Sequence, residues 1–212
     1  MEAFIRSEQY NFIKAQTQIL INGHSTINEE SVLAALKSMA EEKVLQLFPN
    51  SSEEQQQLLH PIVYIEEKAQ AEKFLLKLKP YVIPFKEVTE QTIKKLFPKV
   101  KKLKVPSLEE MDRREISYVG WNDRGSNKKY IIALYENKLI GLQGTFQTNH
   151  QKGICAICNG YEEVGMFLSE GKGAEKGTFI KRGNYICQDS QICNQNLTTL
   201  DKLNNFIELL RR

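Results

Sequence analysis

The 212-residue sequence has no apolar run near the roughly 18 to 20 residues that a membrane-spanning helix needs. Its first residues include Glu2 and lack the uninterrupted apolar core of a signal peptide. The excess of one sign of charge over the other is also small, since the formal net charge at pH 7 is only +3, which by itself identifies no partner. We therefore expect an ordinary globular protein of the cytoplasm, without membrane contact.

Motifs for hydrolysis or nucleotide binding are missing as well. The three histidines, His24, His60 and His150, are scattered, and no serine, histidine and aspartate grouping surrounds them. His150 precedes the first cysteine by five residues, but one histidine without a partner does not make a catalytic metal site. The stretch "GKGAEKG" lacks the Ser or Thr that follows Gly-Lys in a phosphate-binding loop, so it predicts a hairpin tip. We expect that the protein is not an enzyme.

Cysteine is rare, with Cys155 and Cys158 in "GICAICNG" and Cys187 and Cys193 in "YICQDSQICNQN". Stable disulfides are uncommon in the cytoplasm. A redox-active Cys-x-x-Cys belongs at a helix start within a βαβ pattern, which this region does not show. Two cysteine pairs separated by 28 residues fit a tetrahedral zinc site. We predict one structural Zn²⁺, with buried unpaired cysteines and redox chemistry as the alternatives.

The first 80 or so residues show the apolar period of helices. Thr26 and Glu29 have the spacing of a capping box at the start of a second helix, and Ser51 and Ser52, which precede two glutamates, are candidates for the N-cap of a third. Short connections between such helices favour an antiparallel bundle. Pro80 and Pro84 interrupt the helical pattern, which predicts a domain boundary near residue 83.

Beyond this boundary the pattern changes from helical to β-rich. The stretches "TEQTIKKLF" and "SLEEMDRR" predict short helices, and "EISYVGW", "KYIIALY" and "LIGLQGTF" predict an antiparallel meander. A knuckle, a hairpin and a terminal helix around the four cysteines then suggest a treble-clef zinc finger. The predicted fold class is α+β, with an N-terminal antiparallel helical bundle (1–83) and an α/β C-terminal domain (84–212) made of two lobes, 84–149 and 150–212.

Two surface features are candidates for binding. Six lysines and no acid lie between Lys94 and Lys104, a pattern typical of either a solvated helix face or a patch for phosphates or acidic proteins. On the C-terminal helix, Phe206 lies beside an apolar stripe, so we expect its truncation to cost the core little. An aromatic in this position either covers the edge of a core or projects as an interface anchor. The stripe consists of Leu200, Leu203, Ile207 and Leu210.

The segments "EISYVGWND", "KKLKVP", "KGICAICN" and "GNYICQDSQICNQNL" together resemble the FusB-type fusidic acid resistance proteins. The resemblance extends over nearly the whole chain. It implies a two-domain protein with a four-cysteine zinc finger in its C-terminal domain. It also implies the function, which is to bind elongation factor G and help it leave ribosomes on which fusidic acid has trapped it, with no chemistry on the drug.

Carried over position by position, the resemblance implies zinc ligation by the four cysteines and contact with the factor by four residues around the finger. These are Ile154, Arg182, Tyr185 and Phe206. The family has Phe where Ile154 stands and Lys where Arg182 stands, so one aromatic ring is lost while apolarity and charge are kept. The group has the composition of an interface hot spot, with aromatic, cationic and apolar members.

The first interpretation is therefore a non-enzymatic, zinc-containing partner of elongation factor G, expected to be monomeric and to act at the ribosome. The alternative is a zinc-finger protein that binds RNA or the ribosome through the patch from Lys94 to Lys104. In the first interpretation, direct contact with nucleic acid is secondary. A zinc hydrolase needs an open position on the metal, and four cysteine ligands leave none.

Overall fold

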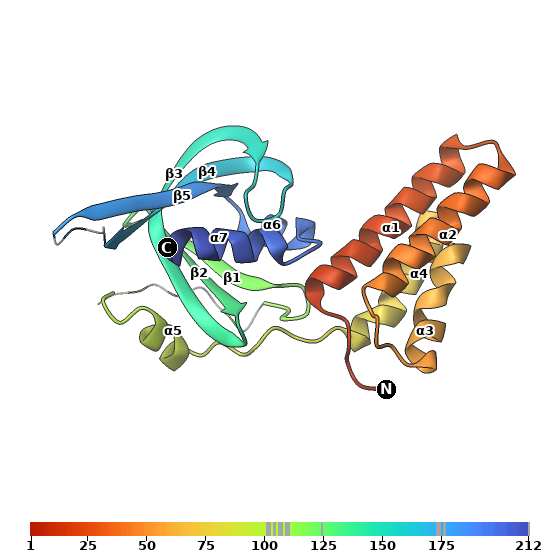
Figure 1. Ribbon diagram of the computed structural model, residues 1–212, viewed down its shortest axis with the longest axis horizontal. Helices are drawn as coiled ribbons and strands as arrows, with labels where there is room; N and C mark the ends of the chain where they lie inside the picture. Colours follow the sequence, from red (N-terminus) through yellow and green to blue (C-terminus); the bar gives the residue numbers. More distant parts are fainter. Residues whose placement is uncertain are drawn as a thin grey trace. The chain divides into compact units, whose positions relative to one another are not determined.

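The structure is a computed structural model of the whole chain (Figure 1). It describes residues 1–212 except 101, 102, 104, 106, 107, 109, 110, 124, 173, 174, 176 and 212, and except the side chains at 149 and 150. The chain divides into two compact units, Met1–Ile83 and Pro84–Arg212. In the described part of the chain, no helix combines the length and the apolarity that crossing a membrane requires.

The first unit is a bundle of helices. Its elements are α1 (Ser7–Thr26), α2 (Glu30–Gln46), α3 (Glu53–Leu59), the 3-10 turn η1 (His60–Tyr64), α4 (Lys68–Leu78) and the 3-10 turn η2 (Lys79–Tyr81). Helix α1 packs against α2 and α4, and Ile13, Leu20 and Leu78 are fully buried between them. A parallel bridge between Ile5 and Val82 ties the beginning of the unit to its end. The predicted helical N-terminal region is confirmed.

The two predicted helix starts have different outcomes. Ser52 is the N-cap of α3, and its hydroxyl accepts a hydrogen bond from the Gln55 amide, as its sequence position indicated. The capping box predicted at Thr26 is wrong, because Thr26 is the last residue of α1. Its hydroxyl donates to the Asn22 carbonyl one turn earlier, at 2.8 Å, so Glu29 becomes the N-cap of α2.

The second unit is built on one five-stranded antiparallel sheet in the order β1-β2-β3-β4-β5. The strands are β1 (Tyr118–Asp123), β2 (Lys128–Tyr135), β3 (Lys138–Ile154), β4 (Tyr161–Lys172) and β5 (Phe179–Cys187). Strands β2 and β3 are joined by Glu136 and Asn137, whose positive φ angles of 48° and 62° indicate a turn that matches the twist of a hairpin. The predicted meander is confirmed and extends over all five strands.

Both faces of this sheet are covered by other elements, namely α5 (Glu90–Leu96), α6 (Ser190–Asn196) and α7 (Asp201–Arg211) (Figure 1). Ile131 and Ala133 on β2 pack on the face that carries α7, whereas Tyr130 and Ile132 pack on the face that carries α5. Burial on both sides explains the continuous apolar run of β2, which a sheet with one solvated face does not need.

The expected division of the second unit into lobes cuts through a strand. Strand β3 continues across residues 149 and 150, so the cysteine-bearing region and the meander share one sheet. The stretch "TEQTIKKLF" forms α5, whose first turn is capped by Thr89. The stretch "SLEEMDRR" includes residues 107, 109 and 110, which lie outside the described residues.

The pairing of β4 with β5 depends on a glycine. A Cβ atom at Gly183 would collide with the carbonyl oxygen of Phe167, whereas a Cβ at Gly171 would meet nothing closer than 3.5 Å. We expect Gly183→Ala to lower the free energy of unfolding of the second unit by about 1–3 kcal/mol, because the strands must part. The matched change Gly171→Ala should cost less than about 0.5 kcal/mol.

Denaturant unfolding followed by the fluorescence of Trp121, the single tryptophan of the chain, measures this difference in the second unit. Equal unfolding midpoints for the two alanine variants would contradict the argument.

Candidate metal centre and the surface around it

The four cysteines come from three separate elements of the second unit. Cys155 follows the last residue of β3 and Cys158 lies in the tight turn after it, which is closed by a 3.0 Å hydrogen bond from the Cys155 amide to the Gly160 carbonyl. Cys187 is the last residue of β5. Cys193 lies in α6, whose start is capped by the Asp189 carboxylate.

All four sulfur atoms converge on one buried point. They lie within 4.8 Å of one another, and the side chains are at most 8% exposed. The Sγ–Sγ distances are 3.7 Å between Cys155 and Cys193 and 3.6 Å between Cys158 and Cys187. A tetrahedral ion with metal–sulfur bonds of about 2.3 Å separates its ligands by about 3.8 Å, whereas a disulfide needs about 2.05 Å. The donors fit a tetrahedral thiophilic metal.

The pKa shifts of the four thiols also favour a bound metal cation. Hydrogen bonds from Cys158 and the other thiols lower the pKa of Cys155, whereas the interaction with Cys155 raises the pKa of Cys187 and Cys193. Four neighbouring thiols therefore cannot all ionise by themselves. A divalent cation removes this conflict, because it binds each of them as a thiolate.

Two of the four predicted partner-binding residues lie at the surface beside this centre, and a third lies farther along β5. Ile154, immediately before Cys155, is 58% exposed, and Tyr185 on β5 is 43% exposed. The amide of Ala156 donates to the Tyr185 carbonyl at 2.9 Å, so the cysteine turn is fastened to β5 at this residue. Arg182 is half-buried on the same edge strand. Their contact with a partner stays a prediction.

The expectation that truncating Phe206 would cost the core little is wrong. Its side chain is 3% exposed and packs edge-to-face on Phe167 of β4, with ring centroids 5.6 Å apart. Phe206 therefore belongs to the core with Leu203 and Ile207. The helical period correctly identified which residues form the apolar stripe. It did not show that the buried face of α7 is wider than the stripe, because the sheet also buries the neighbouring residue Phe206.

Two exposed apolar residues near the metal centre were missed in the sequence. Tyr161 pairs directly with Ile154 across β3 and β4 and is 63% exposed. Ile192, immediately before Cys193, is 40% exposed. The position of Tyr161 next to the Gly160 turn was a usable signal, because it begins the strand that pairs with the residue preceding Cys155. We call Ile154, Tyr161, Tyr185 and Ile192 the finger rim.

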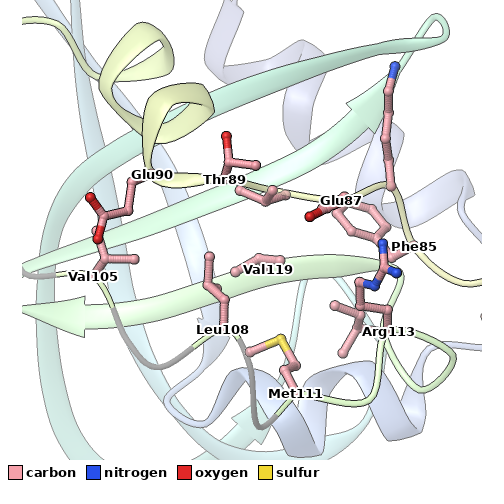
Figure 2. A pocket seen from close by; sticks show the side chains of 12 residues that line it. Phe85, Glu87, Thr89, Glu90, Val105, Leu108, Met111, Arg113 and Val119 are labelled. Atoms are coloured by element: carbon pink, nitrogen blue, oxygen red, sulfur yellow. The ribbon is translucent and has the colours of Figure 1, made fainter.

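A hollow of about 660 Å³ lies on the other face of the sheet. Figure 2 shows Leu108 and Met111 reaching toward Val119 of β1, with the charged side chains of Glu90 and Arg113 near its mouth. Its lining includes neither the cysteines nor the finger rim, so it is separate from the metal centre.

Two other features singled out in the sequence fall partly beyond the described chain. In the lysine-rich stretch, Lys94 forms an exposed ion pair with Glu90 at 3.6 Å, while Lys101, Lys102 and Lys104 lie outside the described residues. The side chain of His150 is also outside them.

Comparisons with known proteins cover both units. The family model "Elongation factor G-binding protein, N-terminal" matches residues 4–86, and "FBP C-terminal treble-clef zinc-finger" matches residues 95–207. A solved structure described as "Structure of the fusidic acid resistance protein FusC" is 33% identical, covers 98% of each chain and has a TM-score of 0.88. A search of curated protein sequences finds no match.

The zinc-finger model and the four buried thiols establish Cys155, Cys158, Cys187 and Cys193 as the site of one structural zinc ion.

We expect one zinc per chain, and we expect Cys155→Ser or Cys187→Ser to abolish zinc binding and unfold the cysteine-bearing region. Structural zinc supplies on the order of 10 kcal/mol of folding free energy, so its loss is comparable to the whole stability of a small domain. The first unit should keep its helices. Elemental analysis, circular dichroism and Trp121 fluorescence measure these three effects.

The matched control is Ile192→Ser, which places a serine at an exposed position beside Cys193 and should retain zinc. Parental zinc content in the Cys155→Ser and Cys187→Ser variants would overturn the assignment of these ligands.

Proposed function

Because this chain belongs to the FusB-type family of elongation factor G-binding proteins, we propose that it binds elongation factor G and promotes release of the factor from ribosomes stalled by fusidic acid. The observation that carries the proposal is the likeness to FusC over 98% of both chains, which includes the helical unit and the zinc-bearing unit. Fusidic acid resistance is the property stated for FusC, and the proposal extends it to this chain.

The action is by binding, and the drug stays chemically unchanged. A binding partner accelerates release only if it favours a conformation of elongation factor G that the ribosome holds weakly. A partner with equal affinity for two conformations does not change their relative populations. The required property of this chain is therefore selectivity between two states of the factor, and tight binding alone does not supply it.

The contact surface that we propose consists of the finger rim together with Arg182. Tyr185 supplies an exposed aromatic of the kind that dominates interface energies, and Arg182 supplies a charge for acidic or carbonyl groups. Ile154 adds apolar area and pairs with Tyr161, which provides an aromatic ring beside the aliphatic position. Zinc holds the turn that presents these residues.

The alternative function, RNA binding through the patch from Lys94 to Lys104, receives no comparable support. Lys94 is already paired with Glu90, and three of the lysines lie outside the described residues. Salt separates the two functions, since RNA binding weakens steeply with salt through counterion release, whereas an interface anchored by apolar groups weakens less.

We expect Tyr185→Ala to weaken binding to elongation factor G by about thirtyfold, or roughly 2 kcal/mol, because it truncates an exposed aromatic of the proposed surface. Phe179→Ala is the matched control, since Phe179 is a 69% exposed aromatic at the opposite end of the same strand. Calorimetric titration with purified elongation factor G measures both affinities. Equal weakening in the two variants, or none in either, would place the interface elsewhere.

Phe206→Ala needs a different interpretation because Phe206 is buried. Removing a buried aromatic costs about 3–5 kcal/mol of stability, so any loss of binding in this variant is to be read against its melting temperature and zinc content. Tyr185→Ala, by contrast, should keep both near the parental values, since its ring is exposed.

In a reconstituted system, we expect the protein to increase the rate at which elongation factor G leaves ribosomes stalled by fusidic acid, and Tyr185→Ala to require a correspondingly higher concentration. Light scattering or labelled factor follows the release, and chromatography of the drug after incubation checks that it is intact. An unchanged release rate at saturating protein, or recovery of modified fusidic acid, would contradict the proposal.

A further inference from the structure

Lys129 is a cation buried in the core of the second unit. Its side chain is 0% exposed, and among the described residues it forms no ion pair with Asp or Glu. The ammonium donates to two neutral oxygens, the Gln188 carbonyl at 2.9 Å and the Asn122 side chain at 3.1 Å, and lies 4.9 Å from the centre of the Phe146 ring. A buried charge of this kind is costly unless an opposite charge compensates it.

The position of Lys129 in the sheet places it on the face that carries the zinc centre. Lys129 alternates with Tyr130 along β2 and so shares the face of Ile131 and Ala133, which pack with the cysteines in one cluster. Its hydrogen bond to Gln188 brings it to the residue that follows Cys187. The neighbouring Lys128 lies on the opposite face by the same alternation.

The zinc centre carries the negative charge that a buried lysine needs as a partner. A divalent ion with four thiolates carries two negative charges in excess, and the four cysteines are buried. Backbone amides compensate part of this charge, and they do so unevenly. Cys155 accepts from the amides of Ile157 and Cys187 at 3.3 Å, and Cys158 accepts from the amide of Gly160 at 3.4 Å.

The other two sulfur atoms have no such donor. In the part of the chain that the structure describes, no backbone amide donates to the sulfur of Cys187 or Cys193. Burial lowers the pKa of Lys129 to about 8, and the charges that oppose this shift most strongly are those of Cys193 and Cys187, ahead of Asp189 and Cys155. Lys129 lies on the face of the sheet that packs with the cysteines, and it is hydrogen-bonded to the residue that follows Cys187.

We propose that Lys129 is the counter-charge of the zinc centre, and that its buried ammonium offsets the negative charge on Cys187 and Cys193 and so raises the affinity for zinc. The lysine does not touch the metal and acts through the thiolates. The proposal rests on this geometry alone and is independent of any role in binding elongation factor G.

Lys129→Met removes the charge and keeps the length of the side chain, and Lys129→Gln also keeps a donor for the Gln188 carbonyl. Lys129→Arg keeps the charge. Lys128→Met makes the same change in net charge one residue away, on the other face of the sheet. Each full-length variant is titrated with Zn²⁺ against a chelator and, after loading with Co²⁺, its absorption spectrum is recorded.

We expect both neutral variants at position 129 to raise the zinc dissociation constant about tenfold or more, within the range usual for outer-shell groups of metal sites. Lys128→Met and Lys129→Arg should stay near the parental value. The sulfur-to-cobalt charge-transfer band of the neutral variants should move to lower energy, because removing a nearby positive charge raises the energy of the sulfur electrons. The d–d bands, which report the tetrahedral geometry, should not move.

The proposal is overturned if the neutral variants bind zinc like the parent, or if Lys129→Arg is weakened as strongly as they are, since size and packing then explain the effect. It is also overturned if the charge-transfer band stays in place while affinity falls. If the neutral variants do not fold well enough to bind Co²⁺, the arginine variant decides, because only a requirement for charge predicts that it binds.

Discussion

The constraint on which the second unit depends is the convergence of four thiolates on one ion. The ligands come from the turn after β3, from the end of β5 and from α6, and the most distant pair, Cys155 and Cys193, is 38 residues apart in the chain. Bringing the ends of segments of this length together costs conformational entropy, and a small domain buries too little apolar surface to offset this cost easily. Zinc binding supplies on the order of 10 kcal/mol, whereas an exposed ion pair supplies about 0–1 kcal/mol. The ion, more than any surface interaction, fixes where these three elements meet.

The metal centre lies between the hydrophobic core of the second unit and an exposed surface. On the inside, the cysteines pack with Phe167 and Phe206 in the core between the sheet and α7. On the outside, the hydrogen bond from Ala156 to Tyr185 fastens the turn, so that Ile154 and Tyr185 are exposed on a backbone that the metal holds in place. Pre-organisation of this kind reduces the entropy lost on binding. A partner that binds only the metal-held form also stabilises metal binding by mass action.

Particular residues show how far the sequence specifies this arrangement. The cysteine spacing predicts the zinc site because ligand geometry is local to each pair, and the change from helical to alternating apolar patterns predicts the two types of unit. The burial of Phe206 is not predicted, because it depends on Phe167 of β4, 39 residues earlier, which covers the side of α7 beyond its stripe. Thr26 was misassigned for a related reason, since its hydroxyl has two possible backbone partners and the sequence does not say which one it takes.

Lys129 illustrates the limit most clearly, since in the sequence it is one of two adjacent lysines at the start of an apolar strand. Only the register of β2 against its neighbours decides that Lys129, and not Lys128, lies on the face that packs with the cysteines. Tyr118, in the same core cluster, suits this environment because it remains uncharged. Burial, reinforced by the negative charge of Cys193, raises the pKa of Tyr118 well above its usual value, so the hydroxyl stays neutral at physiological pH. Lys129 therefore adds positive charge beside the centre and Tyr118 adds none, and both properties favour keeping an anionic metal centre in an apolar core.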